Sequence, residues 1–235
     1  MILGMDTTSD RLHLVLAEPA GRTWARAVDA VPGRSHSVTL LPTVAELLAE
    51  AGAEPAALTG VVVCVGPGGF TALRIGVATA EGLALTGLPT WGFSAFELRA
   101  RSLRLQGSQG PVWIVLDGQR QEAFLQLWDG QALGPALKQP LAGLPTLIGS
   151  QPWWAPEGFR AKAAAHLAQP AVALAGQESE AAATLAGLAA LCRERPSDPP
   201  ESPLAPFYLR ETDAEVNFPE ASMHLSEAMR RGTAR

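Results

Sequence analysis

Apolar and polar residues alternate over much of the first thirty positions. Three segments carry this alternation, 2–8, 12–17 and 23–28, and Ser9-Asp10 and Pro19-Ala20-Gly21 separate them. Period-two alternation is typical of strands with one buried face, and short polar breaks rich in Gly, Pro, Ser and Asp are typical of turns. The pattern predicts an antiparallel meander of three strands at the start of the chain.

After Pro32-Gly33 the apolar positions follow a helical period. One helical face collects Leu40, Leu41, Val44, Leu47, Leu48 and Ala51, and Gly52 is a natural stop. Pro42 must lie in the first turn of this helix or kink it, because proline has no amide hydrogen to donate. A helix that ends at Gly52 is therefore predicted.

A second change of pattern follows at Val61–Val65, a β-branched apolar run that predicts a strand buried on both faces. The turn Gly66-Pro67-Gly68-Gly69 ends this strand. Beyond it the sequence predicts a helix over 71–85, a strand over 89–92, and a helix from the N-cap Ser94 to Leu103. Helices and strands thus alternate after the meander, which indicates an α/β protein.

The second half of the chain is punctuated by Pro and Gly. A polar spacer, 106–110, precedes a predicted hairpin of strands 112–117 and 122–128, and helical composition returns over 158–168 and 178–195. We therefore predict an N-terminal lobe over 1–105, a smaller and degenerate C-terminal lobe over 106–210, and a tail over 211–235.

Composition narrows the class of protein. The chain has 235 residues, of which 47% are hydrophobic, so it can bury a substantial core. Its net charge of −5 and the lack of a long basic run argue against a nucleic acid as a direct ligand. Two distant cysteines, Cys64 and Cys192, suit a reducing cytoplasm, and no segment has the apolar length of a membrane span or the composition of a leader.

The turn between the fourth strand and the second helix is the first candidate for chemistry. Glycines allow a tight turn there, and free amides at a helix start can bind an anion. The end of the first strand would face this turn, so the candidate phosphate loop comprises Asp6, Thr7, Thr8, Gly66, Gly68 and Gly69. The alternative is a tight turn without a ligand, with Asp6 capping its own turn, since neither a P-loop nor a dinucleotide fingerprint is present.

The second helix is the other candidate. Ala72, Gly76, Ala80 and Ala84 recur every four residues, a stripe that lets another helix approach closely. Ordinary packing on the helix's own sheet is the alternative. Because the first helix is also apolar over a wide arc, the two helices carry more apolar surface than one sheet face requires, which indicates an interaction surface.

Other signals for chemistry are weak. The four histidines are scattered, so no metal site is expected, and neither a HExxH nor a GxSxG pattern occurs. Asp117 and Glu122 flank a hairpin turn and are interpreted as turn residues. We interpret Trp153-Trp154 as a loop plug in preference to a partner anchor. No catalytic residue, metal or cofactor is therefore predicted.

Several of these segments together resemble the TsaB family, the dimerisation subunit of the bacterial system that makes threonylcarbamoyladenosine in tRNA. The resemblance covers most of residues 1–128 and the end of the chain. It is carried by GMDTT at 4–8, SHS at 35–37 with LLP at 40–42, GPGGFTALRIGVATAEGLAL at 66–85, LDGQRQEAF at 116–124 and YLR at 208–210.

The resemblance implies an actin-like, sugar-kinase ATPase (ASKHA, ribonuclease H-like) fold of two lobes, each with a mixed sheet flanked by helices. It also implies that the chain has no catalytic site and pairs with its catalytic paralogue TsaD through the two helices. A TsaE-type ATPase would join this pair, and the chain would form a homodimer when alone. Because the chain is acidic, we expect little or no direct contact with the tRNA. The partner-binding residues expected from the pattern and the resemblance are Leu40, Leu41, Val44, Leu47, Leu48, Ala72, Leu73, Arg74, Gly76, Val77, Ala80 and Ala84.

The sequence departs from the family pattern at two positions, Gly69, where Ser is typical, and Ala72, where Gly is typical. Loss of the hydroxyl weakens the case for phosphate binding. Two other functions stay open at this point: an autonomous ATP-dependent phosphotransferase of the same fold, and a glycoprotease-like peptidase. The scarcity of lysine, with Lys138 and Lys162 the only two, disfavours the first.

Overall fold

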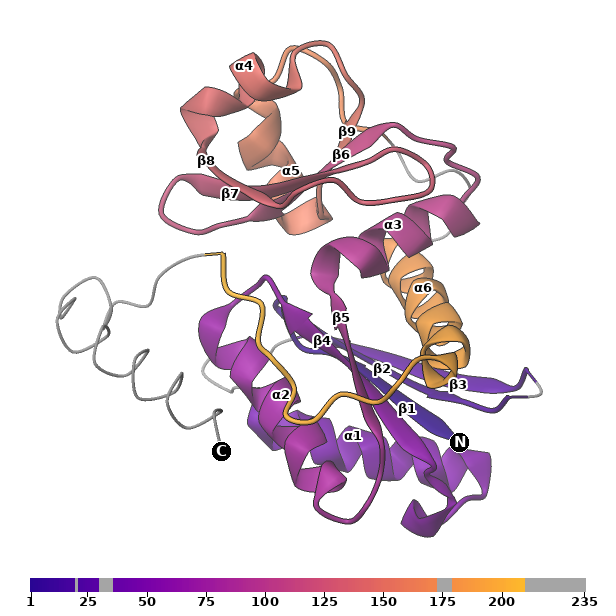
Figure 1. Cartoon of the computed structure of the whole chain (residues 1–235). Coiled ribbons are helices and arrows are strands. Elements are labelled where there is room, and N and C mark those ends of the chain that lie inside the picture. Colours follow the sequence, from indigo (N-terminus) through magenta and orange to yellow (C-terminus); the bar gives the residue numbers. More distant parts are fainter. Residues whose placement is uncertain (20, 30–35, 173–178, 210–235) are drawn as a thin grey trace, which may run out of the picture.

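The computed structural model describes residues 1–19, 21–29, 36–172 and 179–209 of the chain. Its first sheet contains the predicted meander, in which β1 (Ile2–Asp6), β2 (Arg11–Ala17) and β3 (Thr23–Asp29) run antiparallel. Strands β4 (Gly60–Gly66) and β5 (Thr90–Ser94) extend the sheet in parallel on the other side of β1. The strand order is β3-β2-β1-β4-β5 (Figure 1).

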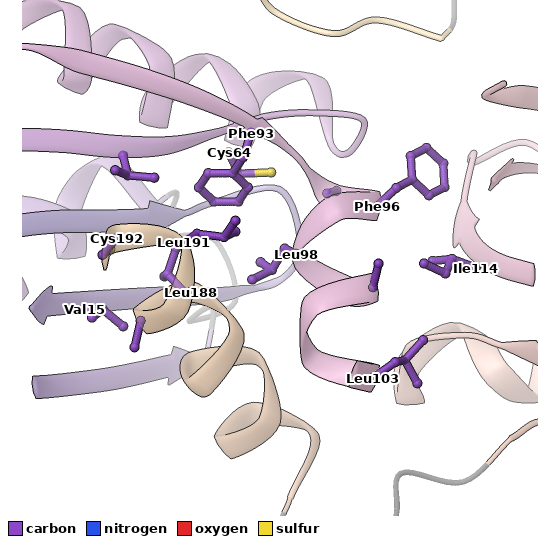
Figure 2. Packing of buried hydrophobic residues seen from close by; sticks show 14 of the residues in the cluster. Val15, Cys64, Phe93, Phe96, Leu98, Leu103, Ile114, Leu188, Leu191 and Cys192 are labelled. Carbon is purple, nitrogen blue, oxygen red and sulfur yellow. The ribbon is translucent and has the colours of Figure 1, made fainter. Parts of the chain in front are cut away.

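Helices cover both faces of this sheet, and the alternation of side chains along the strands decides which face each residue serves. Leu3, Met5 and Leu14 belong to the core under α1 (His36–Ala51) and α2 (Phe70–Ala84). Val15 and Val62 belong to the core under α3 (Ala95–Leu105) and α6 (Glu180–Glu194). Figure 2 shows Leu188, Leu191 and Cys192 of α6 in this second core, near Val15 and Cys64.

Helix α1 begins four residues before the predicted apolar face and ends at Ala51. Pro42 therefore lies inside the helix and not in its first turn. Proline cannot donate to the carbonyl of Val38, but Val38 and Pro42 both lie on the solvent side, where water can satisfy that carbonyl. The predicted cap of α3 is confirmed, since Ser94 Oγ accepts a 3.0 Å hydrogen bond from the amide of Glu97.

The second sheet has the order β8-β7-β6-β9. The predicted hairpin is confirmed as β6 (Val112–Asp117) and β7 (Glu122–Trp128), to which β8 (Leu137–Pro140) adds antiparallel. β9 (Trp153–Trp154) pairs parallel with β6, and both tryptophans are buried, so they are strand residues in the core and not a loop plug. Helices α4 (Leu144–Ile148) and α5 (Glu157–Ala164) complete the lobe.

The chain does not divide into two consecutive lobes as the predicted ranges 1–105 and 106–210 suggest. Helix α6 leaves the second lobe and packs on β1, β2 and α3 of the first (Figure 1). The segment after it stays there, because Phe207 donates its amide to Val65 O at 2.6 Å. Physically, α6 supplies the apolar cover that α3 alone cannot give that sheet face. Arg210 and the predicted tail 211–235 lie outside the described residues.

Among the described residues, none of the helices has both the length and the apolar composition required to cross a membrane.

Candidate functional site

The end of β1 carries the carboxylate of the candidate phosphate loop, and the structure gives that carboxylate internal partners. Asp6 is fully buried, and its Oδ1 accepts hydrogen bonds from the amide of Thr8 at 3.0 Å and the Thr8 hydroxyl at 2.6 Å. Its Oδ2 lies 3.2 Å from Nη2 of Arg99 on α3. The same guanidinium donates through Nη1 to Thr184 of α6 at 2.9 Å. Asp6 thus links β1 to two helices.

A buried histidine completes this cluster. His13 Nδ1 lies 3.8 Å from Asp6 Oδ2 and makes no hydrogen bond within the described part of the chain. Burial lowers the pKa of His13 to about 4, and the attraction of Asp6 offsets burial only in part. Burial alone would raise the pKa of Asp6, but the charge of Arg99, His13 and the bonds from Thr8 together hold the pKa of that carboxyl below its usual value. The cluster is therefore an ion pair of Asp6 and Arg99 beside a neutral imidazole at neutral pH.

The glycine turn packs directly on the end of β1. A Cβ at Gly68 would lie 2.5 Å from Thr8 O, so only glycine fits there. The amide of Gly69 donates to the same Thr8 carbonyl at 3.0 Å. No side chain caps the start of α2 at Gly69. Close backbone packing therefore accounts for Gly68, whereas a Cβ at Gly69 would make only ordinary contacts, the nearest at 3.7 Å.

Gly76 has a similar explanation. A Cβ at this position would lie 2.5 Å from Thr7 Oγ1, and the Thr7 hydroxyl donates to the carbonyl of Ala72 at 2.8 Å. The predicted stripe of small residues thus begins where α2 approaches its own first strand. The alternative considered from the sequence, packing of α2 on its own sheet, holds for Gly76.

A cleft of about 810 Å³ opens between the lobes beside these residues. Among the described residues, the wall includes five carboxylates, Asp10, Asp29, Asp117, Glu157 and Glu180, and two guanidiniums, Arg11 and Arg99. Arg11 is paired with Asp29 at 2.5 Å. The actin-like fold implies a nucleotide with its metal in such a cleft. The described residues do not fit the phosphates of that group, because both guanidiniums of the wall are already paired, Arg99 with Asp6 and Arg11 with Asp29.

The remaining candidates for chemistry are structural. Cys64 and Cys192 are buried, and burial raises the pKa of both thiols, so neither is a reactive thiolate. Within the described ranges no cluster of three or more His, Cys, Asp or Glu side chains could hold a metal ion. Asp117 Oδ1 accepts from the amide of Gln119 at 2.8 Å, as a turn residue does.

The predicted partner-binding residues differ in exposure, and most are part of the core of this chain. Buried against the first sheet are Leu40, Val44, Leu47, Leu48, Leu73, Gly76, Val77 and Ala80. Ala72 and Ala84 are half-buried, while Leu41 and Arg74 are exposed. The apolar period therefore marks the inner faces of α1 and α2. These eight residues pack in the core of this chain and do not form an exposed surface. Their part in partner binding stays a prediction.

The outer faces of the same helices nevertheless carry large apolar side chains. Val38 and Leu41 on α1 are 54% and 55% exposed, and Phe70 on α2 and Leu85 directly after it are 42% and 91% exposed. On α2, Phe70, Arg74, Ala78 and Gly82 are all exposed and recur every four residues, so they form one line along the helix. We call these outer residues of the two helices, together with Pro42 and Ala45, the outer helix face.

Sequence reasoning assigned no role to two residues that the structure brings forward, Arg99 and His13, and it used Tyr208 only as part of the motif YLR at 208–210. Arg99 lies on the helix after β5, and the pairing with Asp6 spans 93 positions, a distance over which no local pattern extends. The line Phe70, Arg74, Ala78, Gly82 could have been found, because it has the same four-residue spacing as the predicted stripe, shifted by two positions.

The strand order of the first sheet and the cleft between two lobes define the class, which is the actin-like fold predicted from the resemblance. Residues 30–149 match the family model described as TsaD, tRNA N6-adenosine threonylcarbamoyltransferase. The chain belongs to this family and, within it, to the YeaZ (TsaB) group.

Two kinds of relative support this placement. The structure is similar to that of YeaZ from Pseudomonas aeruginosa, with a TM-score of 0.69 and 26% identity over 88% of this chain and 99% of that one. In sequence the chain is 34% identical to an uncharacterized protein of Mycobacterium tuberculosis (strain ATCC 25618 / H37Rv), over 79% of this chain and 80% of that protein. It is 33% identical to the tRNA threonylcarbamoyladenosine biosynthesis protein TsaB of Bacillus subtilis (strain 168), over 41% of this chain and 43% of that protein.

Proposed function

We propose that this chain is a non-catalytic subunit of a tRNA threonylcarbamoyladenosine synthesis complex. In this proposal it pairs with a TsaD-type threonylcarbamoyltransferase through the outer helix face and keeps that enzyme active. The proposal rests first on the family, since TsaB of Bacillus subtilis is named for this biosynthesis and the family model is that of the transferase. Because a subunit of this complex would act where tRNA is modified, the proposal includes a cytoplasmic location.

The observation that carries the pairing is the exposure of large apolar side chains on α1 and α2. Of the six large hydrophobic residues that are exposed in the described part of the chain, Val38, Leu41, Phe70 and Leu85 belong to these two helices or follow directly. Apolar side chains gathered on one face of a monomer are typical of a protein interface. A partner of the same family would offer a similar pair of helices.

The absence of catalysis is supported by the cleft. Asp6, the acid in the position where chemistry would be expected, is held by Arg99 and Thr8, and the wall of the cleft is acidic. This arrangement disfavours the autonomous phosphotransferase. The peptidase is disfavoured because the buried thiols are not reactive and the described residues form no metal cluster. A TsaE-type ATPase at the pair and a homodimer of the free chain remain part of the proposal.

Reconstitution of the modified nucleoside tests this function. The assay combines tRNA, the threonylcarbamoyl-adenylate synthase, TsaD-type and TsaE-type proteins from the same genome, and this chain. We expect product only when the chain is present, and we expect Leu41→Glu to abolish product. Leu105→Glu is the matched control, because Leu105 is equally exposed at 52% but lies on α3.

Two results would contradict the proposal. One is full product without this chain, and the other is equal product with Leu41→Glu and wild type. Tight binding of ATP with Mg²⁺ by the isolated chain, measured by titration calorimetry, would favour the phosphotransferase instead.

A further inference from the structure

Three side chains form an exposed cluster at the start of α2. The guanidinium carbon of Arg74 lies 3.9 Å from the centroid of the Phe70 ring, and the rings of Phe70 and Tyr208 are 5.5 Å apart. Arg74 Nε donates to Tyr208 Oη at 3.1 Å. Phe70 and Tyr208 are each about two-fifths exposed. A stacked arginine with two aromatic neighbours loses little further freedom when it binds a partner.

Tyr208 reaches this cluster because the end of the described chain is fixed along the first lobe. We call residues 198–209 the C-terminal strap. Its backbone exchanges hydrogen bonds with β5, since the amide of Glu201 donates to Thr90 O at 2.8 Å. The amide of Leu204 donates to Glu81 on α2 at 2.5 Å, and that of Phe207 to Val65 O at 2.6 Å. Figure 1 shows this segment crossing α2 after it leaves α6.

The cluster continues the outer helix face. Phe70 and Arg74 are the first two positions of the exposed line that runs on to Ala78 and Gly82. A partner helix laid along this line would meet the cluster at one end. Tyr208 would then belong to the same surface although it lies 134 positions from Arg74.

The positive charge of Arg74 restricts which side chains the partner can place opposite it. The Nε atom of Arg74 donates to Tyr208. Its two terminal nitrogens have no hydrogen-bond partner among the residues that the structure describes. No carboxylate of the described residues forms an ion pair with it, in contrast to Arg11, Arg26 and Arg99. Two parallel donors of a guanidinium match the two oxygens of a carboxylate.

We propose that Phe70, Arg74 and Tyr208 form the anchor of the docking surface, and that the partner presents there an apolar helix surface with one Asp or Glu carboxylate for Arg74. This inference rests on the proposed function, because the partner is the TsaD-type protein of that proposal. Tyr208 acts as a positioning residue for Arg74 and as an apolar contact, so the C-terminal strap takes part in recognition.

Titration of the full chain with the purified TsaD-type protein of the same genome tests the anchor. We expect Arg74→Gln and Tyr208→Ala each to weaken the dissociation constant at least about tenfold, as hot-spot residues do. We expect the wild-type complex to weaken more with added salt than the Arg74→Gln complex, because the lost contact is an ion pair. Leu105→Ala, an exposed residue outside the surface, should bind like wild type.

The hydroxyl of Tyr208 has a test of its own. Tyr208→Phe keeps the ring but removes the acceptor that orients Arg74, and we expect it to weaken binding about threefold in the wild-type background. In the Arg74→Gln background the same change should have no effect, which a merely structural role of the tyrosine would not produce. Thermal unfolding of each variant checks the fold. Arg74→Gln changes an exposed residue, so it keeps the test valid if Tyr208→Ala unfolds.

The outcomes separate this inference from the proposed function. If Leu41→Glu abolishes binding while Arg74→Gln and Tyr208→Ala bind within twofold of wild type, the anchor is overturned and the pairing stands. If Leu41→Glu also binds like wild type, both fail.

Discussion

The cleft beside the glycine turn and the outer helix face both border α2, but they differ in how their side chains are covered. Polar groups beside the cleft have partners within the chain, whereas apolar side chains of the outer helix face are exposed. Beside the cleft, Asp6 accepts hydrogen bonds from Thr8 and Arg99, and the amide of Gly69 donates to the carbonyl of Thr8. On the outer helix face, Leu41 and Phe70 remain uncovered although they are apolar. A buried carboxylate with internal partners stabilises the fold, whereas exposed apolar side chains gathered on one face are typical of an interface. In this chain, therefore, the glycine turn and Asp6 have the more familiar sequence pattern, but their contacts serve the fold.

The largest expected effect separates the inner from the outer face of α2. Ala80 is fully buried, so Ala80→Arg places an unpaired cation in the core and should cost more than about 4 kcal/mol of unfolding free energy. Ala78 is exposed two positions earlier, and Ala78→Arg should change the unfolding free energy by less than about 0.5 kcal/mol. Chemical denaturation of both variants measures this. Equal stability of the two would show that α2 is oriented differently.

The second test breaks the cleft. Arg99→Met removes the partner of a buried carboxylate, and we expect a loss of about 3 to 5 kcal/mol in the unfolding free energy. The double variant Asp6→Asn with Arg99→Met should lose less than Arg99→Met alone, because no buried charge is left unpaired. The measurement is again the denaturation midpoint. A loss below about 1 kcal/mol for Arg99→Met would contradict the structural role of the pair.

The third test uses pH. The pKa of His13 is lowered to about 4 by burial, against an ordinary value of 6.5, so the unfolded chain takes up this proton before the folded chain does. Stability is therefore unaffected by His13 above the ordinary pKa and falls as the pH drops toward 4, by about 3 kcal/mol for the whole window. His13→Gln should remove that part of the decline when unfolding is measured between about pH 7 and about pH 4. Parallel curves for the two proteins would be inconsistent with a neutral buried imidazole.

The smallest effect comes from one substitution made twice on α2. Gly76→Ala drives a methyl group against Thr7 Oγ1 and should destabilise by about 2 kcal/mol. Gly82→Ala meets nothing within 4 Å and should stabilise by up to about 1 kcal/mol, since alanine is the better helix residue. Thermal unfolding distinguishes the two signs. The same sign for both would contradict the close approach of Gly76 to Thr7.

Much of the fold could be predicted from the sequence because it follows local periodicity. Strands β6 and β7 have the predicted bounds, and α2 differs from its predicted range by one residue at each end. The position of α6 could not be predicted in this way. Its place on β1 depends on a contact between Gly4 and Cys192, which lie 188 positions apart. No local pattern encodes such a contact.

The candidate site shows the same limit. Helical period located the two helices but assigned their apolar stripe, including Leu48 and Ala80, to a partner when their own sheet covers it. Periodicity indicates that a helix face is buried, but it does not show whether the chain's own sheet or a partner covers that face. The exposed residues that matter more, Val38 and Phe70, lie outside the regular stripe, and Tyr208 reaches α2 only through the C-terminal strap.

Sedimentation of this chain mixed with the TsaD-type protein tests the central claim most directly. The wild type and Leu105→Glu should sediment with the partner as a one-to-one complex, while Ala78→Arg, folded but altered on the outer helix face, should sediment apart from it. A complex of unchanged size and affinity with Ala78→Arg would contradict the claim that this face joins the two proteins.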